Sequence, residues 1–450
     1  MPKQNQVTLE KVVSLCKRRG LVYPSAEIYG GINGVYDFGH LGTLIKRNIR
    51  NAWLKSLQKS FEDILFFEGS LLAPSPVWEA SGHVQNFSDP MVDCLNCKHR
   101  FRADELDLKK PCPNCGQTKW TEVRQFNLMF QTNVGAIQDK SSIAYLRPET
   151  AQAIFINFKN IISTNRVKIP FGVSQIGKAF RNEITPKQFL FRSREFEQME
   201  IEWFCNPKNA INDFNLWCKA RKEFYASLGL NMNKIRLREH GRDELAHYSI
   251  SCTDVEYEFP FGWKEIEGIA NRGNYDLTQH SKHSGKDLGV FDEETKQSYI
   301  PHVVECSVGS DRLFLTILCD AYTEDFIDSE ERIVLKLSPE IAPIKAAFLP
   351  LVKKLNEPMY KIYQDIRSLG YEIEFDESGS IGKRYRRQDE IGTPLCFTYD
   401  FESINDNSVT VRHRDTTNQE RINIDKIREY LKNSLNPSYP STSSGRADLR

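Results

Sequence analysis

Residues 195–204 read EFEQMEIEWF, a run in which charged and apolar side chains alternate. Successive side chains of a β-strand point to opposite faces, so this alternation predicts a strand with two different faces. One face carries Phe196, Gln198, Glu200 and Glu202. The other carries Glu195, Glu197, Met199, Ile201 and Trp203. The ordinary interpretation is an amphipathic strand whose polar face meets water.

The segment before this strand favours a second interpretation. FRNE (180–183) predicts a preceding strand, and ITPKQFLFRSR (184–194) predicts a cationic loop between the two. Hairpin partners face the same way, so one sheet surface would hold Arg181, Glu183, Phe196 and Glu200. An arginine binds phosphate, a phenyl ring stacks on a purine, and carboxylates hold Mg²⁺ or an ammonium group. The hairpin therefore predicts a nucleotide site, with a solvated polar face as the alternative.

Four cysteines are grouped in a predicted insert, residues 91–120. They follow the pattern C-x2-C-x14-C-x2-C and are Cys94, Cys97, Cys112 and Cys115. Two facing turns with this spacing supply four thiolates and leave no open position, which is typical of a structural Zn²⁺ site. The alternative is four free or disulfide-linked cysteines.

The composition of the whole chain limits the function classes. A chain of 450 residues is suited to two or three domains. Lys+Arg and Asp+Glu both number 60, which excludes a uniformly basic nucleic-acid coat and leaves only local patches. Eleven cysteines argue against a secreted disulfide framework. Without an apolar signal core or a long apolar run, we expect a cytoplasmic protein that does not enter a membrane.

The pattern along the chain predicts a large N-terminal domain, residues 1–335. Residues 8–19 predict a helix with Thr8 as its N-cap, and residues 29–42 predict loops and turns. An apolar stripe over 41–61 predicts a long helix that packs either on its own core or on a second subunit. A mixed insertion is predicted over 207–250. Strands are predicted at 254–270 and 301–307, followed by a helix near 311–322.

A second, smaller domain is predicted over residues 336–436. Its strand-like segments are 345–351, 371–375, 395–401 and 408–414. Strands that alternate with helical stretches indicate a small α/β domain. Residues 437–450 are rich in Ser and Pro and predict a disordered tail.

Several segments of the chain resemble one enzyme family. FRNE with REFEQMEIEWF resembles motif 2 of the class II aminoacyl-tRNA synthetases, and GSDRL (309–313) resembles motif 3. The long helix with Pro74 after it resembles motif 1, which forms a dimer interface in that class. Within the class, LRPETAQ (146–152) and EIEGIANR (265–272) are similar to the dimeric glycyl-tRNA synthetases. The resemblance implies an α+β fold: an antiparallel catalytic sheet with helices, plus a small α/β anticodon-binding domain.

The resemblance also implies which residues bind ATP. Arg181 and Arg312 would be the catalytic arginines that stabilise the phosphates, with Mg²⁺ near Glu265 and Glu305. The full set implied for ATP is Arg181, Asn182, Glu183, Phe191, Arg192, Ser193, Arg194, Glu195, Phe196, Glu265, Ile266, Gly309, Ser310, Asp311 and Arg312.

A second implied set binds glycine: Arg102, Glu149, Phe196, Glu197, Gln198, Met199, Glu200, Arg272, Glu305 and Ser307. Glycine lacks a side chain, and one methylene is worth only ~1–3 kcal/mol of discrimination. A glycine site must therefore exclude Cβ sterically and bind the ammonium group strongly, which clustered glutamates would do. Each glutamate has an alternative role as the partner of a nearby arginine.

The basic run GKRYRRQDE (382–390) lies in the segment that resembles the anticodon-binding domain. There Lys383, Arg384, Arg386 and Arg387 would contact tRNA phosphates, and Tyr385 would stack on an unpaired base. The alternative is a solvated helix face.

The predicted function is ATP-dependent ligation of glycine to tRNA(Gly) through a glycyl-adenylate by a homodimer. ATP is the expected second substrate, with Mg²⁺ and a structural Zn²⁺ as the expected metals. One alternative is a synthetase for another amino acid. A second is a synthetase-like, non-catalytic nucleic-acid-binding accessory protein. A third is a zinc-ribbon nucleic-acid binder without enzymatic activity.

Overall fold

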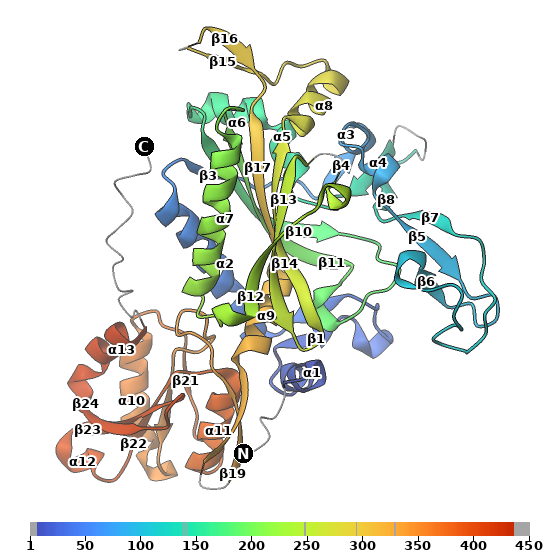
Figure 1. The fold of residues 1–450 in the computed structure, drawn as a ribbon. Helices are drawn as coiled ribbons and strands as arrows, with labels where there is room; N and C mark the ends of the chain where they lie inside the picture. Colours follow the sequence, from blue (N-terminus) through green and yellow to red (C-terminus); the bar gives the residue numbers. More distant parts are fainter. Residues whose placement is uncertain are drawn as a thin grey trace.

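A computed structural model describes residues 7–435 except 138, 140–141, 247–248, 294 and 328–329. The predicted tail, 437–450, lies outside this part. The centre is a seven-stranded sheet in the order β12-β13-β14-β17-β11-β10-β3 (Figure 1). Its strands are β3 Ile64–Phe66, β10 Phe171–Phe180, β11 Glu195–Cys205, β12 Ile235–Glu239, β13 Ser251–Phe259, β14 Gly262–Gly273 and β17 His302–Gly309. Every pair is antiparallel except β10 with β3.

Four helices cover one face of this sheet: α1 Leu9–Arg18, α2 His40–Ser60, α7 Ala210–Ser227 and α9 Ser310–Ala321. They enclose the largest apolar cluster of the chain, to which β11 contributes Met199, Ile201 and Trp203. The predicted helix 8–19 is confirmed as α1, and the Oγ1 atom of Thr8 accepts the N–H of Lys11. The predicted helix near 311–322 is confirmed as α9.

Helix α2 settles how its apolar stripe packs. Leu44, Ile45, Ile49, Trp53 and Leu57 are all buried within this one chain. The stripe therefore packs on the protein's own core, and a second subunit is not needed to cover it.

Three further helices, α5 Ala151–Ile156, α6 Phe158–Asn165 and α8 Tyr275–Ser284, lie on the opposite face of the sheet. Their apolar side chains join Val173 of β10 and Phe204 of β11 in a second cluster. Short helices α3 Ser75–Ala80 and α4 His83–Asn86 adjoin α8, as Figure 1 shows. These elements border the polar face of β11 and β17, where the candidate site lies.

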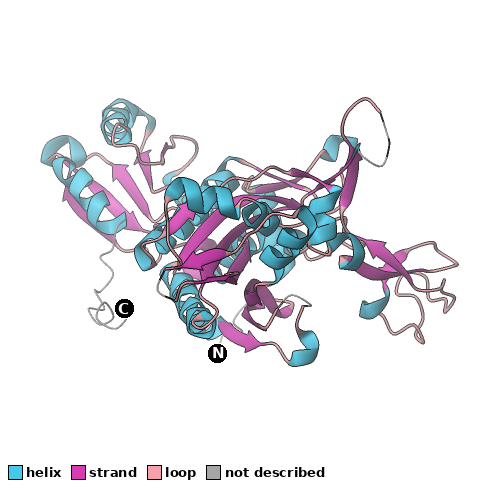
Figure 2. Cartoon of the chain, turned by 90° about the horizontal axis from the view of Figure 1, so that it is seen from above, coloured by secondary structure: helices cyan, strands magenta, loops and turns pink. Residues whose placement is uncertain are grey.

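The predicted insert forms a small projecting sheet in the order β6-β5-β7 (Figure 2). Its strands are β5 Ser88–Asp93, β6 Arg100–Arg102 and β7 Arg124–Asn127, so the unit is wider than the predicted 91–120. Beside it lies the sheet β4-β9-β8, with β4 Leu72–Pro74, β8 Phe130–Asn133 and β9 Ile143–Leu146. Two short hairpins lie elsewhere in the chain: β1 Val22–Pro24 with β2 Tyr36–Phe38 beside α1, and β15 Val290–Asp292 with β16 Gln297–Tyr299 at the top of Figure 1, near α8.

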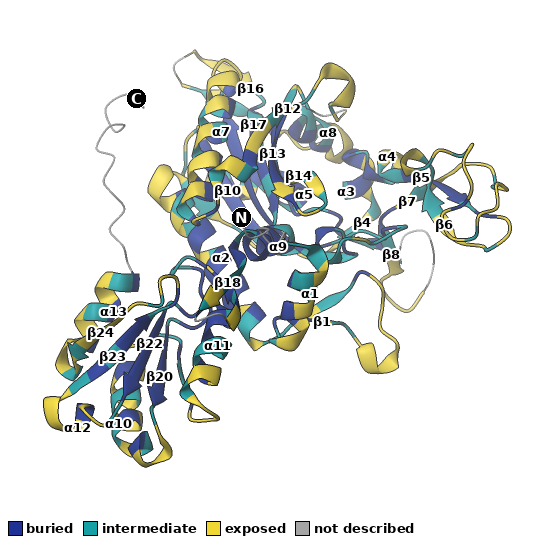
Figure 3. Ribbon diagram, turned by 60° about the horizontal axis from the view of Figure 1, so that its bottom comes forward, coloured by how far each residue is buried: buried dark blue, intermediate teal, exposed yellow. Residues whose placement is uncertain are grey.

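The C-terminal part is a separate five-stranded sheet in the order β21-β20-β22-β23-β24. Its strands are β20 Ala346–Pro350, β21 Ile373–Phe375, β22 Leu395–Tyr399, β23 Ser408–His413 and β24 Gln419–Asn423. Its helices are α10 Asn356–Arg367, α11 Ile381–Ile391, α12 Ser403–Asp406 and α13 Ile427–Leu435. The hairpin of β18 Tyr322–Ile327 and β19 Glu330–Leu335 joins it to α9. Figure 3 shows both parts with buried strands and exposed outer helix faces.

The strands predicted over 254–270 are confirmed as the hairpin of β13 and β14, with Pro260 and Phe261 between them. Two predicted features differ from the structure. Residues 29–42 are not all loop, since β2 and the first turn of α2 fall there. Residues 207–250 are no peripheral insertion: α7 supplies the core residue Trp217, and β12 is the edge strand of the central sheet.

None of the helices within the described residues combines the length and the apolar content that a membrane-spanning helix requires.

Candidate active site

Strand β11 has the two faces that its alternation predicts. Met199 and Ile201 are buried among the helices, while Gln198 and Glu200 lie on the opposite face. Arg181 and Glu183 follow β10 in the connecting segment, where FRNE was predicted to be strand. The backbone N–H of Arg181 nevertheless donates to Arg194 and holds the ends of the segment together. Arg181 therefore stays above β11, with its guanidinium carbon 5.3 Å from the ring centre of Phe196.

Glu200 is the centre of a compact polar group. Its Oε1 atom accepts hydrogen bonds from Gln198 Nε2 at 2.9 Å and from Ser307 Oγ at 2.6 Å. Its Oε2 atom accepts the hydroxyl of Thr150. Ser307 meets Glu200 because the two residues are cross-strand partners of β17 and β11.

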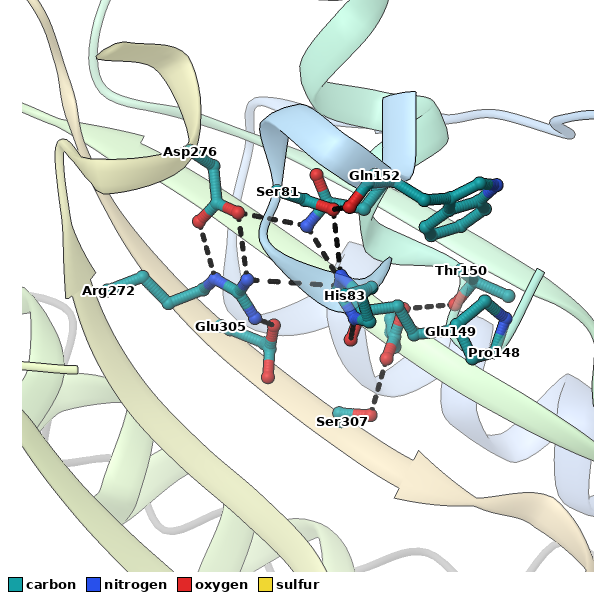
Figure 4. Close-up of polar contacts among 12 residues, drawn as sticks. Ser81, His83, Pro148, Glu149, Thr150, Gln152, Arg272, Asp276, Glu305 and Ser307 are labelled. Carbon is teal, nitrogen blue, oxygen red and sulfur yellow. Dashed lines mark hydrogen bonds and ion pairs between the residues drawn. The ribbon is translucent and has the colours of Figure 1, made fainter. Parts of the chain in front are cut away.

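Glu149 precedes α5 in the chain, and side chains from two helices hold its carboxylate (Figure 4). His83 Nε2 lies 3.2 Å from Oε2, and Gln152 Nε2 lies 2.9 Å from Oε1. The other ring nitrogen of His83 is 2.8 Å from the hydroxyl of Ser81. Glu149 is thus held in a single orientation by side chains from α4 and α5.

Arg272 crosses the pocket from the end of β14 (Figure 4). It donates to both oxygens of Asp276, from Nε at 2.8 Å and from Nη2 at 2.9 Å, and from Nη1 to Glu305 Oε2 at 2.5 Å. Its Nη2 also lies 4.0 Å from Glu149. One guanidinium therefore ties together three carboxylates.

These carboxyl groups are electrostatically unequal. Burial opposes the ionisation of Glu149, but His83 and Arg272 hold its pKa below its ordinary value. Burial raises the pKa of Glu305 to about 8, with Arg272 opposing the rise and Glu200 adding to it. Burial also raises the pKa of Glu200, and the nearby Glu149 adds to that rise. The pocket has an excess of acid groups, which suits a cationic ligand.

Two residues of the implied glycine set lie on the other face of β11. Glu197 forms ion pairs with Arg50 and, at 3.6 Å, with Lys46, both of α2, and Met199 is in the apolar core. Burial opposes the ionisation of Glu197, and these cations hold its pKa below its ordinary value. Arg102 lies in the projecting insert, paired with Asp89 at 2.5 Å and Asp104 at 2.7 Å. The structure does not bring these three residues to the Glu149–Glu200–Glu305 group.

Arg312, in the first turn of α9, lies at the other end of the polar face. Its Nε atom donates to the carbonyl of Phe191 at 3.1 Å, and its guanidinium is 4.6 Å from that ring centre. Its Nη1 atom is 3.2 Å from Glu265 Oε1. Glu305 lies opposite Ala270, five residues along β14 from Glu265, or ~17 Å at ~3.3 Å per residue. Glu265 and Glu305 therefore do not share one metal ion.

The rest of the implied ATP set divides into two groups. One group lines the loop: Asn182, Glu183, Arg192, Ser193, Arg194 and Glu195. Arg192 pairs with Glu105 at 2.8 Å, and Arg194 donates to the carbonyl of Glu183 at 2.9 Å. The other group, Ile266, Gly309, Ser310 and Asp311, lies at or beneath the start of α9. Asp311 is turned inward, where Lys46 Nζ is 2.5 Å away.

The four predicted metal-binding cysteines converge in the projecting insert. Their sulfur atoms all lie within 4.8 Å of one another, with Cys94 and Cys115 3.6 Å apart and Cys97 and Cys112 3.8 Å apart. Four sulfurs held tetrahedrally at ~2.3 Å from a Zn²⁺ ion would be ~3.8 Å apart. The cysteines therefore form a group whose dimensions fit a metal ion.

The basic run 382–390 lies within helix α11, which buries some of its side chains and leaves others nearer the surface. Arg384 is buried and donates to three backbone carbonyls, those of Pro350, Asp376 and Leu351. Tyr385 bonds to Thr398 at 2.7 Å. Arg384 therefore has internal partners, whereas Tyr385 is half-buried.

Three basic residues of the run lie nearer the surface of α11. Lys383 is exposed, Arg386 pairs with Glu330 at 3.4 Å and Arg387 pairs with Asp376 at 2.5 Å. These three are the basic side chains of the run whose tRNA contacts stay a prediction, since Arg384 is buried.

The structure adds residues that the sequence interpretation did not select: Ser81, His83, Thr150, Gln152 and Asp276. Asp276 stands four residues after Arg272, but the pair joins the end of β14 to the first turn of α8, so the helical i,i+4 rule could not have found it. Thr150 and Gln152 belong to the quoted LRPETAQ segment, but spacing alone does not say which of its side chains face the site.

Comparison with known proteins agrees with this geometry. Residues 130–322 match the model of the tRNA synthetase class II core domain (G, H, P, S and T), and residues 345–434 match the anticodon binding domain. The glycine–tRNA ligase of Caldanaerobacter subterraneus is 50% identical over 96% of this chain and 99% of its own. The glycine–tRNA ligase of Treponema denticola is 49% identical over 96% of this chain and 99% of its own length. That of Borreliella afzelii is 50% identical over 95% of this chain and 98% of its own length. The chain belongs to the glycine–tRNA ligase family of class II aminoacyl-tRNA synthetases.

Proposed function

We propose that this enzyme activates glycine with ATP and transfers it to tRNA(Gly), releasing pyrophosphate and AMP. The observation that carries the proposal is the acidic group on the polar face of β11 and β17, in which Arg272 lies against Glu149 and Glu305 while Glu200 is held beside them by Ser307. An ammonium group is the ligand that such an acidic pocket binds best. A small amino acid without a side chain fits beside carboxylates that are already held by neighbours.

In the first step the glycine carboxylate would attack the α-phosphate of ATP. Arg181 and Arg312 would stabilise the developing charge, so catalysis consists of positioning and electrostatics. Phe196, under the guanidinium of Arg181, offers a face on which adenine would stack. Mg²⁺ would enter with ATP and neutralise phosphate charge. In the second step a ribose hydroxyl of the terminal adenosine of tRNA would attack the adenylate.

The remaining partners are part of the same proposal. The sulfur spacing of the four cysteines supports a structural Zn²⁺ in the insert, held by Cys94, Cys97, Cys112 and Cys115. Exposed apolar side chains at Ile28, Tyr29 and Ile32 support a homodimer in which a second chain covers them. Lys383, Arg386 and Arg387 would contact tRNA. We expect the enzyme to act in the cytoplasm, where its tRNA substrate is.

Amino-acid-dependent exchange of pyrophosphate into ATP tests the proposal. We expect exchange with glycine and at least 100-fold less with alanine or serine at equal concentration. Exchange with serine or alanine but not with glycine would indicate a synthetase of different specificity. Absence of exchange with all amino acids, together with tRNA binding, would favour the non-catalytic alternative.

A further inference from the structure

Glu202 of β11 is the most enclosed carboxyl group near the pocket. Its exposed fraction is 0%, whereas the side chains of Glu149 and Glu305 are each 12% exposed. Both carboxyl oxygens of Glu202 lack a hydrogen-bond partner among the residues that the structure describes. An ionised carboxylate in such surroundings is among the most costly groups to bury.

The neighbours of Glu202 on the sheet face explain its position. Val173 of β10 and Glu305 of β17 are its two cross-strand partners. Phe204, two residues further along β11, faces the same way and belongs with Val173 to the apolar cluster beneath α5 and α6. Glu202 thus stands at the boundary between this cluster and the acidic pocket.

Arg272, the cation nearest to this group of acids, is already paired with carboxylates other than Glu202. Arg272 binds Asp276 with two nitrogens and Glu305 with the third. The Cβ atoms of cross-strand partners lie ~4.5–5.5 Å apart, so an ionised Glu202 would face the carboxylate of Glu305 directly. Like charges at this distance repel, and Arg272 would be drawn away from Glu305.

We propose that Glu202 is a neutral carboxylic acid that keeps its proton through the catalytic cycle and positions Glu305 for the substrate ammonium group. Because its exposed fraction is 0%, Glu202 does not touch glycine and acts through Glu305. Because Glu202 is neutral, the guanidinium of Arg272 stays paired with Glu305 and Asp276. The positioning role rests on the proposed function, whereas the protonation state does not.

The electrostatics agree with this assignment. Burial raises the pKa of Glu202 well above its ordinary value, and the neighbouring Glu305 raises it further. A carboxyl group whose pKa is higher in the folded than in the unfolded chain stabilises the fold at low pH. That stabilisation is lost progressively as the pH rises from the unfolded pKa through the folded one.

The first test compares thermal unfolding of the wild type and Glu202→Gln between pH 5.5 and pH 8. Glutamine matches the neutral acid in size and cannot ionise. We expect the unfolding midpoint of Glu202→Gln, measured relative to that of the wild type, to rise by roughly 3 °C between pH 5.5 and pH 8. A difference between the two midpoints that stays constant, or that falls as the pH rises, would overturn the proposal.

Glu197→Gln is the matched control, because Glu197 lies on the same strand and is buried with its charge paired to Lys46 and Arg50. Its pKa is lowered, so the opposite sign is expected: the variant should be less stable than the wild type at pH 8, and the gap should narrow toward pH 4. If the stability difference between the wild type and Glu197→Gln grows toward pH 4, the pH dependence has the opposite sign to the one expected. The Glu202→Gln result would then no longer support the proposal.

Infrared spectroscopy supplies a readout that does not depend on a variant's stability. At pH 7, with glycine and ATP saturating, the difference spectrum of the wild type minus Glu202→Gln or Glu202→Met should contain a protonated-carboxyl stretch. The same stretch should persist in Glu305→Gln, which separates a proton on Glu202 from one on Glu305. Difference spectra without this band, or a band that disappears in Glu305→Gln, would overturn the proposal.

The positioning role is tested by glycine-dependent exchange. We expect Glu202→Ala to raise the KM for glycine at least 10-fold while kcat changes less, and Glu202→Gln to restore KM to within about threefold of the wild type. Equal damage in both variants would overturn the positioning role. If the wild type shows no exchange with glycine, the proposed function fails, and the unfolding and infrared measurements still decide whether Glu202 holds a proton.

Discussion

The carboxyl groups of the pocket differ because each faces a different neighbour. Glu149 faces His83 and Gln152, which donate to it, whereas Glu305 faces an acid across the strand pair. Arg272 supplies one positive charge to several carboxylates. The incoming ammonium group would supply a second, so occupancy by glycine and occupancy by protons must compete.

Competition between protons and glycine predicts a pH-dependent KM. Glu305, whose pKa is raised to about 8, is mostly protonated below that pH and offers the ammonium group no charge. As the pH rises toward 8 the carboxylate forms, so the KM for glycine should fall by up to about tenfold per pH unit and level off above 8. Pyrophosphate exchange at saturating ATP, measured from pH 6 to 9, checks this.

Glu305→Gln provides the control for this pH profile. The amide cannot ionise, so KM should be higher than in the wild type at pH 8 and nearly independent of pH between 6 and 8. A wild-type KM that does not change over this interval would contradict the assignment of Glu305 as the titrating ligand.

Arg181 yields a prediction about kcat. It lies against Phe196 and donates to the carbonyl of Pro148 at 3.1 Å, a placement that a planar guanidinium can hold and a lysine cannot. Arg181→Lys should lower kcat of exchange by 10²–10³, the cost of about one lost charge-stabilising donor. Arg428→Lys, which changes an exposed arginine of the C-terminal domain, should leave kcat unchanged. A loss below fivefold at Arg181 would mean that this side chain does not stabilise the transition state.

At the scale of elements, periodicity predicted well wherever burial is one-sided. The alternation of 195–204 gave the correct faces of β11, and the stripe of 41–61 gave α2, because in both a whole set of apolar positions must turn to the same core. Thr8 ended up at its predicted cap because capping is a local hydrogen bond. The apolar pattern of 41–61 could not show whether the helix packs on the core of its own chain or on a second subunit.

Prediction failed where tertiary contacts decide. Arg384 looks like its neighbours in the basic run, and only the fold shows that three carbonyls bind it. β24 was not predicted, since QERIN (419–423) is polar and most of its side chains are exposed on an edge strand. Likewise Glu202 was assigned to the correct face, but its closeness to Glu305 depends on strand register, which a single sequence does not reveal.

The projecting insert is an element whose stability should depend on metal. Cys94 and Cys112 are buried, and the other buried side chains of this small sheet are Asp89, Met91 and Val92 of β5. Removing Zn²⁺ with a chelator should make four thiols per chain reactive toward a colorimetric reagent, and Cys112→Ser should purify with less than one tenth of the wild-type metal. Cys306, buried in the main core, should stay unreactive in both. Wild-type enzyme without stoichiometric metal would refute the zinc site.

At the scale of the whole molecule, α11 connects the two folded parts. Asp389 is fully buried there and receives both terminal nitrogens of Arg412, at 2.8 and 3.0 Å. Arg332 of β19 lies 3.4 Å from the same carboxylate and pairs with Asp325 of β18. Since β18 directly follows α9, this network links the helix that bears Arg312 to the anticodon-binding domain (Figure 1).

This junction predicts that charging of tRNA is more sensitive than amino-acid activation. Asp389→Asn leaves two buried guanidinium groups without full compensation, which costs about 3–5 kcal/mol of unfolding free energy. The loss should appear in urea unfolding of the C-terminal part. Aminoacylation of tRNA(Gly) should fall at least 10-fold, because one tRNA molecule must contact both domains and their relative position must be kept. Pyrophosphate exchange, which uses only the catalytic domain, should fall less than threefold.

Glu390→Gln is the matched control, one residue further along α11. Its carboxylate pairs with Arg19 at 2.6 Å and Arg18 at 3.1 Å near the surface, where an ion pair is worth about 0–1 kcal/mol. It also bridges the two parts, so equal damage to aminoacylation from both variants would show that any contact across the junction matters. Damage confined to Asp389→Asn would instead locate the coupling in the buried network. A parallel loss of exchange and aminoacylation in Asp389→Asn would exclude that coupling, because it would mean that the substitution disturbs the catalytic domain itself.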